Sequence, residues 1–164
     1  MKGQDTDWRQ AKLDIDIDRT RCFYETVDDS LGFDCAGCRN FRIAYPLIPD
    51  AVQGFFRQLG VDIGKPAEMT AYVSHDGNLT LYDGFYHICG SILKSPKLFI
   101  QIDEKHSQLD ENATIKLTPD HFAYFTSECA LVEKEFPTPV IQMGIHGNIP
   151  WVLEESNPYH YPDD

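Results

Sequence analysis

The chain has 164 residues, a length typical of one domain. Hydrophobic residues make up 42% and charged residues 24%, which is ordinary globular usage and excludes a disordered, collagenous or coiled-coil chain. The 26 Asp and Glu outnumber the 14 Lys and Arg, and the resulting formal net charge of −12 disfavours binding to nucleic acid or to anionic membranes.

The N-terminus and the cysteines indicate the cellular compartment of the protein. The N-terminus lacks the apolar core of a signal peptide, and no run approaches the roughly 18 consecutive apolar residues of a membrane span. We therefore expect a cytoplasmic protein, whose thiols are kept reduced. The cysteines are odd in number, and their spacings do not suggest a disulfide scaffold. They are Cys22, Cys35, Cys38, Cys89 and Cys129.

The first part of the chain mixes strand and helix signals. Residues 1–11 are polar and aperiodic, so a loose N-terminal arm is expected. Apolar and acidic residues alternate over 13–18, the period of a half-buried strand, and a second strand is predicted over 21–27. The clearest helix covers 50–59, with a single apolar stripe, and Gly60 suits its C-terminal cap.

Strand signals dominate from Thr70 onward. The runs 70–74 and 79–82 are joined through Asp76-Gly77, a strong hairpin signal because glycine tolerates a positive φ. Further strands are predicted, in chain order, over 85–93, 98–102, 113–117, 139–145 and, after a turn at Gly147-Asn148, 151–153.

Residues 119–135 are compatible with two structures. Thr118-Pro119-Asp120 is a good helix start, and apolar residues then repeat every three to four positions. The aromatic residues within 122–126 favour a strand instead. We predict the helix and keep the strand as the alternative.

These elements predict an α+β fold. About six to eight strands with one or two helices, unevenly distributed and without an internal repeat, indicate a mainly antiparallel sheet. We expect a single domain over residues 12–156, followed by a loose C-terminal tail over 157–164.

Cys35-Ala36-Gly37-Cys38 is the main candidate for chemistry. Two cysteines at this spacing can direct their sulfur atoms at one zinc ion, which needs two further ligands. His87 and Cys89 lie two apart in a predicted strand and project from one face, and Cys22 is the other candidate ligand. The alternative is that these cysteines are small buried hydrophobic residues, because free cysteine is among the most buried residue types.

The same pair could act as a redox dithiol. Such sites lie at the start of a helix whose dipole lowers the thiol pKa. Here a turn precedes the pair, and Pro46 would stop a helix from Cys38 near Tyr45. Asp34 would also raise the pKa of the Cys35 thiol. The sequence therefore ranks redox chemistry below metal binding.

Aromatic residues gather near Asp83-Gly84, where a bulge or a second turn is predicted. Tyr82, Phe85 and Tyr86 could line a surface for a partner or ligand, because aromatic groups with polar tips often do so. The alternative is that they pack in the core.

Three stretches carry a resemblance to a known family. Cys35-Ala-Gly-Cys38-Arg-Asn40, Leu59-Gly60-Val61-Asp62 and Lys65-Pro66-Ala67-Glu68 together resemble a small family of uncharacterised bacterial proteins, over about residues 22–93. Members often carry another cysteine two positions before the pair, where this chain has Phe33, which removes a potential metal ligand. The resemblance implies a bacterial cytosolic protein and supplies no activity.

Three functions follow, in order of preference. The sequence contains no nucleophile elbow, P-loop or dinucleotide fingerprint. The first function is therefore a non-catalytic acidic protein that binds or regulates a partner. A basic protein surface would match its charge. The second is a structural or sensory zinc-binding protein that uses Cys35 and Cys38. The third is a thiol–disulfide oxidoreductase that uses the same two cysteines.

Overall fold

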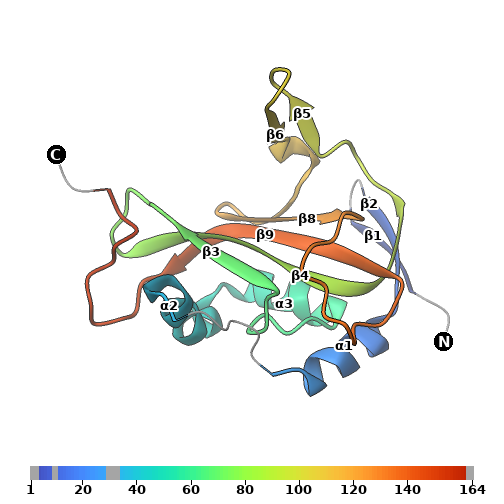
Figure 1. Cartoon of the computed structure of the whole chain (residues 1–164), viewed down its shortest axis with the longest axis horizontal. Helices are drawn as coiled ribbons and strands as arrows, with labels where there is room; N and C mark the ends of the chain where they lie inside the picture. Colours follow the sequence, from blue (N-terminus) through green and yellow to red (C-terminus); the bar gives the residue numbers. More distant parts are fainter. Residues whose placement is uncertain (1–3, 9–10, 29–33, 162–164) are drawn as a thin grey trace.

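One large antiparallel sheet forms the frame of the molecule (Figure 1). The computed structural model describes residues 4–8, 11–28 and 34–161. In the sheet the strands follow the order β1-β2-β4-β9-β8-β7, and β3 pairs with β4. Their bounds are Gln4–Trp8 (β1), Ala11–Ile15 (β2), Glu68–Tyr72 (β3), Leu79–Lys94 (β4), Ile115–Thr118 (β7), His121–Thr126 (β8) and Val140–Pro150 (β9).

Strand β4 organises this sheet. One of its edges pairs with β9 over residues 79–89. Along the other edge, β3 pairs with residues 81–85 and β2 with residues 90–94. At Gly90, a Cβ atom would lie 2.5 Å from the Asp14 carbonyl oxygen, so the close approach of β2 requires glycine.

In the described part of the chain, three helices cover one face of the sheet (Figure 1). They are α1 (Ile17–Thr26), α2 (Ala36–Ala44) and α3 (Asp50–Leu59), and the 3₁₀ turns are η1 (Tyr45–Leu47) and η2 (Glu111–Ala113). The core lies between the helices and the sheet, where Phe41, Phe56 and Tyr86 are almost fully buried. No helix in the described part of the chain is long and apolar enough to cross a membrane.

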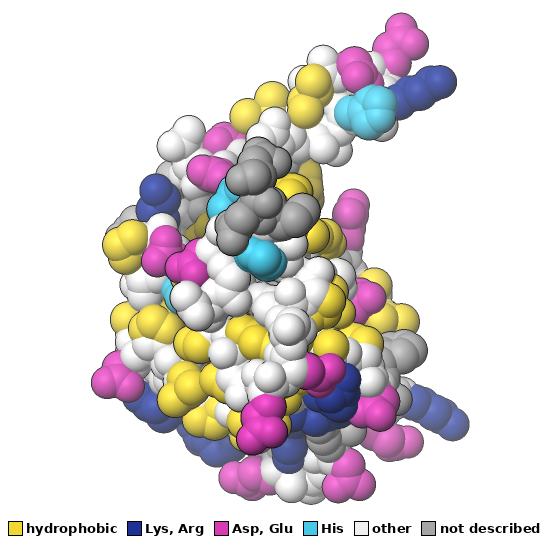
Figure 2. All heavy atoms as spheres, turned by 90° about the vertical axis from the view of Figure 1, so that its left-hand side faces the viewer, with side chains coloured by type: hydrophobic (Ala, Val, Ile, Leu, Met, Phe, Trp, Pro, Cys, Tyr) yellow, Lys and Arg dark blue, Asp and Glu magenta, His cyan; other side chains and the backbone are white. Residues whose placement is uncertain are grey.

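A small hairpin projects from the opposite side of the sheet (Figure 1). It consists of β5 (Phe99–Gln101) and β6 (Ser107–Leu109), and its strands pair with each other alone among the described residues. Figure 2 shows the hairpin standing clear of the body, with charged side chains gathered at its tip.

The predicted α+β class is confirmed: the chain is a single domain with a mainly antiparallel sheet. The helix predicted over 50–59 matches α3, and Gly60 caps it with φ 74°, in the left-handed region. The strands predicted over 79–82 and 85–93 are continuous in β4. One or two helices are predicted, whereas the described residues form three, α1, α2 and α3.

The strand prediction for 21–27 is wrong, because this segment belongs to α1. Strand β2 ends at Ile15, and the Asp16 side chain then accepts a hydrogen bond from the Arg19 backbone N–H at 3.0 Å. Asp16 is thus an N-cap, which starts the helix at Ile17.

The helix prediction for 119–135 is also wrong, and the strand alternative is correct. In β8 buried residues alternate with half-buried ones, and the strand pairs with β9. Strand β9 itself continues to Pro150, so there is no turn at Gly147, and 151–153 forms no strand.

Both expected loose termini contain ordered segments. Within the expected arm over 1–11, residues 4–8 form β1 and pair with β2. Within the expected tail over 157–164, the Ser74 backbone N–H donates to the Tyr159 carbonyl at 2.9 Å, and the Tyr161 N–H donates to the Ser74 carbonyl at 3.1 Å.

Candidate functional site

Helix α2 begins at the cysteine pair. Cys35 has extended backbone angles and occupies the N-cap position, and its Sγ accepts a hydrogen bond from the Cys38 backbone N–H at 3.4 Å. A thiolate at this position faces the unpaired amide groups of the first helical turn, where the helix dipole is positive. The local sequence thus places Cys35 where a negative charge is stabilised.

The two thiols differ in access to solvent. Their Sγ atoms lie 3.1 Å apart. Cys35 is exposed, whereas Cys38 is only 5% exposed beneath the first turn of α2. A reagent from solution therefore meets Cys35 first, and Cys38 is shielded.

The surroundings of Cys35 favour its thiolate form. Partial burial tends to raise the pKa of Cys35, but hydrogen bonds outweigh it and the pKa is lowered overall. The donors are the Cys38 thiol, the backbone N–H groups of Cys38 and Gly37, and the Tyr159 hydroxyl. A thiolate is the nucleophilic form of cysteine, so Cys35 is the more reactive thiol of the pair.

Asp34 does not have the expected effect on the pair. The Arg39 guanidinium lies one helical turn after Cys35, with its Nε 3.8 Å from an Asp34 carboxylate oxygen. Arg39 also forms an ion pair with Glu155. The expectation that Asp34 would raise the thiol pKa is wrong, because the pKa of Cys35 is lowered by donors that act on the sulfur directly.

A buried polar network fixes the first turn of α2 on the sheet. The Tyr82 hydroxyl donates to the Gly37 carbonyl at 2.8 Å, and the fully buried Asn40 donates to the Tyr82 oxygen at 3.1 Å. Asn40 also donates to the Pro150 carbonyl at 3.0 Å and accepts from the Val152 N–H at 2.8 Å. Gly37 and Asn40 are thereby held between β4 and the chain that follows β9.

The close packing at Gly37 explains the third residue of the motif. A Cβ atom there would lie 2.8 Å from the Ala71 Cβ and 3.2 Å from the Tyr159 hydroxyl. Only glycine lets α2 approach β3 this closely. The turn between the two cysteines is therefore set by packing against the sheet.

The structure does not bring the predicted zinc ligands together. Cys22 is exposed on α1, Cys35 and Cys38 lie at the start of α2, and His87 and Cys89 are buried in β4. His87 Nε2 lies 3.3 Å from Gln142 Oε1, so its ring is bound within the sheet. In the described residues, no group of three or more His, Cys, Asp or Glu side chains could hold a metal ion.

The three aromatic residues predicted to line a surface are divided between two environments. Tyr82 and Tyr86 are buried under the helices, with exposures of 2% and 0%, and the Tyr86 hydroxyl donates to the Ile63 carbonyl at 2.6 Å. Phe85 is half-buried and contacts the His87 ring edge-on. Successive β4 side chains point to opposite faces of the sheet, so Tyr82 and Tyr86 share the face that the helices cover. Both are therefore core residues.

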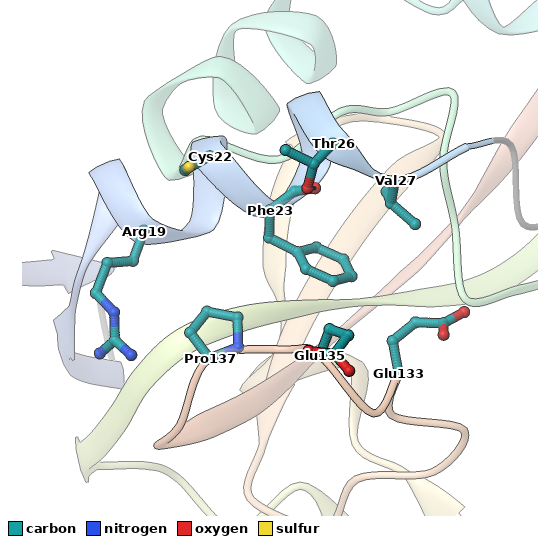
Figure 3. Close-up of a pocket in the computed structure, with 8 residues that line it drawn as sticks. All are labelled: Arg19, Cys22, Phe23, Thr26, Val27, Glu133, Glu135 and Pro137. Carbon is teal, nitrogen blue, oxygen red and sulfur yellow. Dashed lines mark hydrogen bonds between the residues drawn. The ribbon is translucent and has the colours of Figure 1, made fainter.

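A separate open cavity of about 460 Å³ lies between α1 and the loop before β9 (Figure 3). Phe23, Val27 and Pro137 supply apolar walls, and Arg19 and Glu133 lie towards opposite ends. The cavity holds Cys22 and neither member of the Cys35–Cys38 pair.

Sequence reasoning missed two residues of the site. Asn40 follows Cys38 by two positions and lies on the buried side of α2. A buried side-chain amide needs hydrogen-bond partners, so this residue could have indicated a buried polar network. Tyr159 lies far along the chain from Cys35 and gives no local signal. Comparison with family models, with curated proteins and with solved structures finds no match to this chain, so the resemblance over residues 22–93 stays a prediction.

Proposed function

We propose that this protein is a thiol–disulfide oxidoreductase with Cys35 as the nucleophile and Cys38 as the resolving thiol. The observation that carries the proposal is the exposed Cys35 at the N-cap of α2, 3.1 Å from the buried Sγ of Cys38. A low-pKa, accessible thiol beside a second thiol is the arrangement that disulfide exchange requires.

The reaction proceeds in two exchanges. The Cys35 thiolate attacks one sulfur of a substrate disulfide, so that a mixed disulfide forms and the other substrate sulfur leaves as a thiolate, which takes up a proton. Cys38 then loses its proton and attacks the Cys35 sulfur, which releases the second substrate thiol. The substrate gains two electrons, and the protein is left with a Cys35–Cys38 disulfide, which a small dithiol or glutathione-type thiol reduces again.

The charge of the chain favours a basic substrate. A formal net charge of −12 attracts disulfides carried by cationic proteins or peptides and repels acidic ones. The zinc alternative has less support, since the described residues offer the pair no third ligand.

A redox titration tests the proposal. The protein is equilibrated in buffers of reduced and oxidised glutathione, and disulfides are mapped by peptide mass spectrometry. We expect a Cys35–Cys38 disulfide with a midpoint between about −270 and −120 mV. Cys38→Ser should accumulate a mixed disulfide at Cys35, because the resolving thiol is gone.

Cys129→Ser is the matched control, since Cys129 is a partly exposed thiol whose pKa is raised by burial. It should leave the midpoint unchanged. Failure of the Cys35–Cys38 disulfide to form at any glutathione ratio would contradict the proposed function.

A further inference from the structure

The chain that follows β9 returns to the start of α2. Asn157 ties it to the β3–β4 hairpin, because its amide nitrogen donates to the Thr80 hydroxyl at 2.9 Å and to the Leu79 carbonyl at 3.2 Å. The Asn157 side-chain oxygen accepts from the Tyr159 N–H at 2.8 Å. The Ser74 N–H also donates to the Tyr159 carbonyl, so the backbone of Tyr159 is held at both its N–H and its carbonyl group.

This anchoring directs the Tyr159 side chain at the cysteine pair. The Tyr159 hydroxyl lies 3.2 Å from the position that a Cβ atom of Gly37 would occupy, between the two cysteines in sequence, and as a donor it lowers the pKa of the Cys35 thiol. The ring of Trp151 packs 6.2 Å from the Tyr159 ring, centroid to centroid. Tyr159 is therefore a donor from outside α2 that lies beside the first turn, where the nucleophilic sulfur is placed.

The other groups around Cys35 are already engaged. The Tyr82 hydroxyl donates to the Gly37 carbonyl, and the Arg39 guanidinium is shared between Asp34 and Glu155. Cys38 donates to Cys35 only until it takes part in the exchange itself. Among the described residues, the charged and titratable groups near the Cys35 thiol are Asp34, Cys38, Arg39, Tyr82, Glu155 and Tyr159.

We propose that Tyr159 is a catalytic residue of the thiol–disulfide exchange, whose hydroxyl donates a hydrogen bond to the Cys35 sulfur and stabilises its thiolate. This inference rests on the proposed function. A phenol keeps its proton at neutral pH, so it donates without adding charge. It stabilises the attacking thiolate and, when the Cys35–Cys38 disulfide is reduced, the Cys35 thiolate that reappears.

The pH dependence of Cys35 alkylation by iodoacetamide tests this role, followed at the Cys35 peptide by mass spectrometry. Tyr159→Phe removes the donor and keeps the ring. We expect the apparent pKa of Cys35 to rise and its alkylation at pH 7 to slow by about threefold or more. Tyr161→Phe is the matched control, since Tyr161 is 52% exposed and stacks on His75; its profile should match the wild type.

A second measurement needs no change at Tyr159. Labelled Tyr159 ring carbons should shift in NMR spectra between the reduced and oxidised protein, because the thiolate acceptor disappears when the disulfide forms. The shift should be lost in Cys35→Ser.

The outcomes separate the two proposals. If the pair cycles normally and both the alkylation profile of Tyr159→Phe and the ring resonances stay unchanged, the role of Tyr159 is refuted while the oxidoreductase function stands. If wild-type Cys35 titrates as an ordinary thiol and forms no disulfide with Cys38, both proposals fail.

Discussion

Two cysteines of this protein occupy opposite chemical environments. Cys35 caps α2, is exposed, and receives several hydrogen bonds that lower the pKa of its thiol. Cys89 lies in the middle of the sheet at 1% exposure, and burial raises the pKa of its thiol. The Cys89 backbone N–H is satisfied by the Thr20 hydroxyl at 3.0 Å, but among the described residues its sulfur has no comparable set of donors.

The comparison shows that reactivity follows from the backbone around the sulfur rather than from the residue type. The first turn of a helix offers unpaired amide groups, whereas the N–H groups of a central strand are used by its neighbours. Thiolate chemistry is therefore expected at the start of α2 and not in β4.

Removing the Cys35 thiol should have the largest effect. Cys35→Ser takes away the nucleophile, so we expect disulfide reduction to fall by at least about 100-fold, measured as the reduction rate of a small aromatic disulfide. Cys22→Ser, which alters a second exposed cysteine, should retain the wild-type rate. Equal loss in both variants would show that the two thiols are not distinguished by their environments.

Removing the Asn40 amide should weaken the support of α2. Asn40→Ala leaves the Tyr82 hydroxyl, the Pro150 carbonyl and the Val152 N–H without this partner in a buried site. We expect the free energy of unfolding to drop by about 2–4 kcal/mol, measured by urea denaturation. Gln58→Ala, on the exposed face of α3, should change it by less than about 0.5 kcal/mol. A neutral result for Asn40→Ala would contradict the network.

The smallest expected effect is on the free energy of unfolding of the reduced protein, which Cys35 and Cys89 should make depend on pH in opposite directions. The lowered pKa of Cys35 means that the folded state loses its proton first, so stability rises as pH increases from the lowered value to the ordinary pKa of 9.0. The raised pKa of Cys89 means that the unfolded state ionises first, so stability falls as pH rises above 9.0.

Urea denaturation between pH 6 and pH 10 measures both slopes. Cys35→Ser should remove the rise below pH 9, and Cys89→Ala should reduce the fall above it. A rise that persists in Cys35→Ser belongs to other groups and would contradict the assignment to Cys35.

The sequence predicts α3 well because all of its signals are local. A start at Asp50, a single apolar stripe and Gly60 at the C-terminal end agree with one another. For α1 the N-cap signal at Asp16 was present, but the alternation of apolar and acidic residues over 13–18 masked it. For β8 the strand is predicted only as the alternative, because nearly every residue from Phe122 to Phe125 is apolar and fits both the helical and the strand period.

The candidate site was predictable only in part. The cysteine spacing identified Cys35 and Cys38, but the sequence could not show that α2 begins between them. The decisive partners of α2 are distant in the chain: Tyr82, Pro150, Val152 and Tyr159. Such contacts depend on the packing of the sheet, which no local pattern encodes.

The late position of these partners has a consequence during translation. Cys35 leaves the ribosome more than 100 residues before Val152 and Tyr159, which hold α2 and its thiol. On a nascent chain the pair therefore lacks the Tyr159 donor, and α2 lacks its Val152 partner, until this last segment docks.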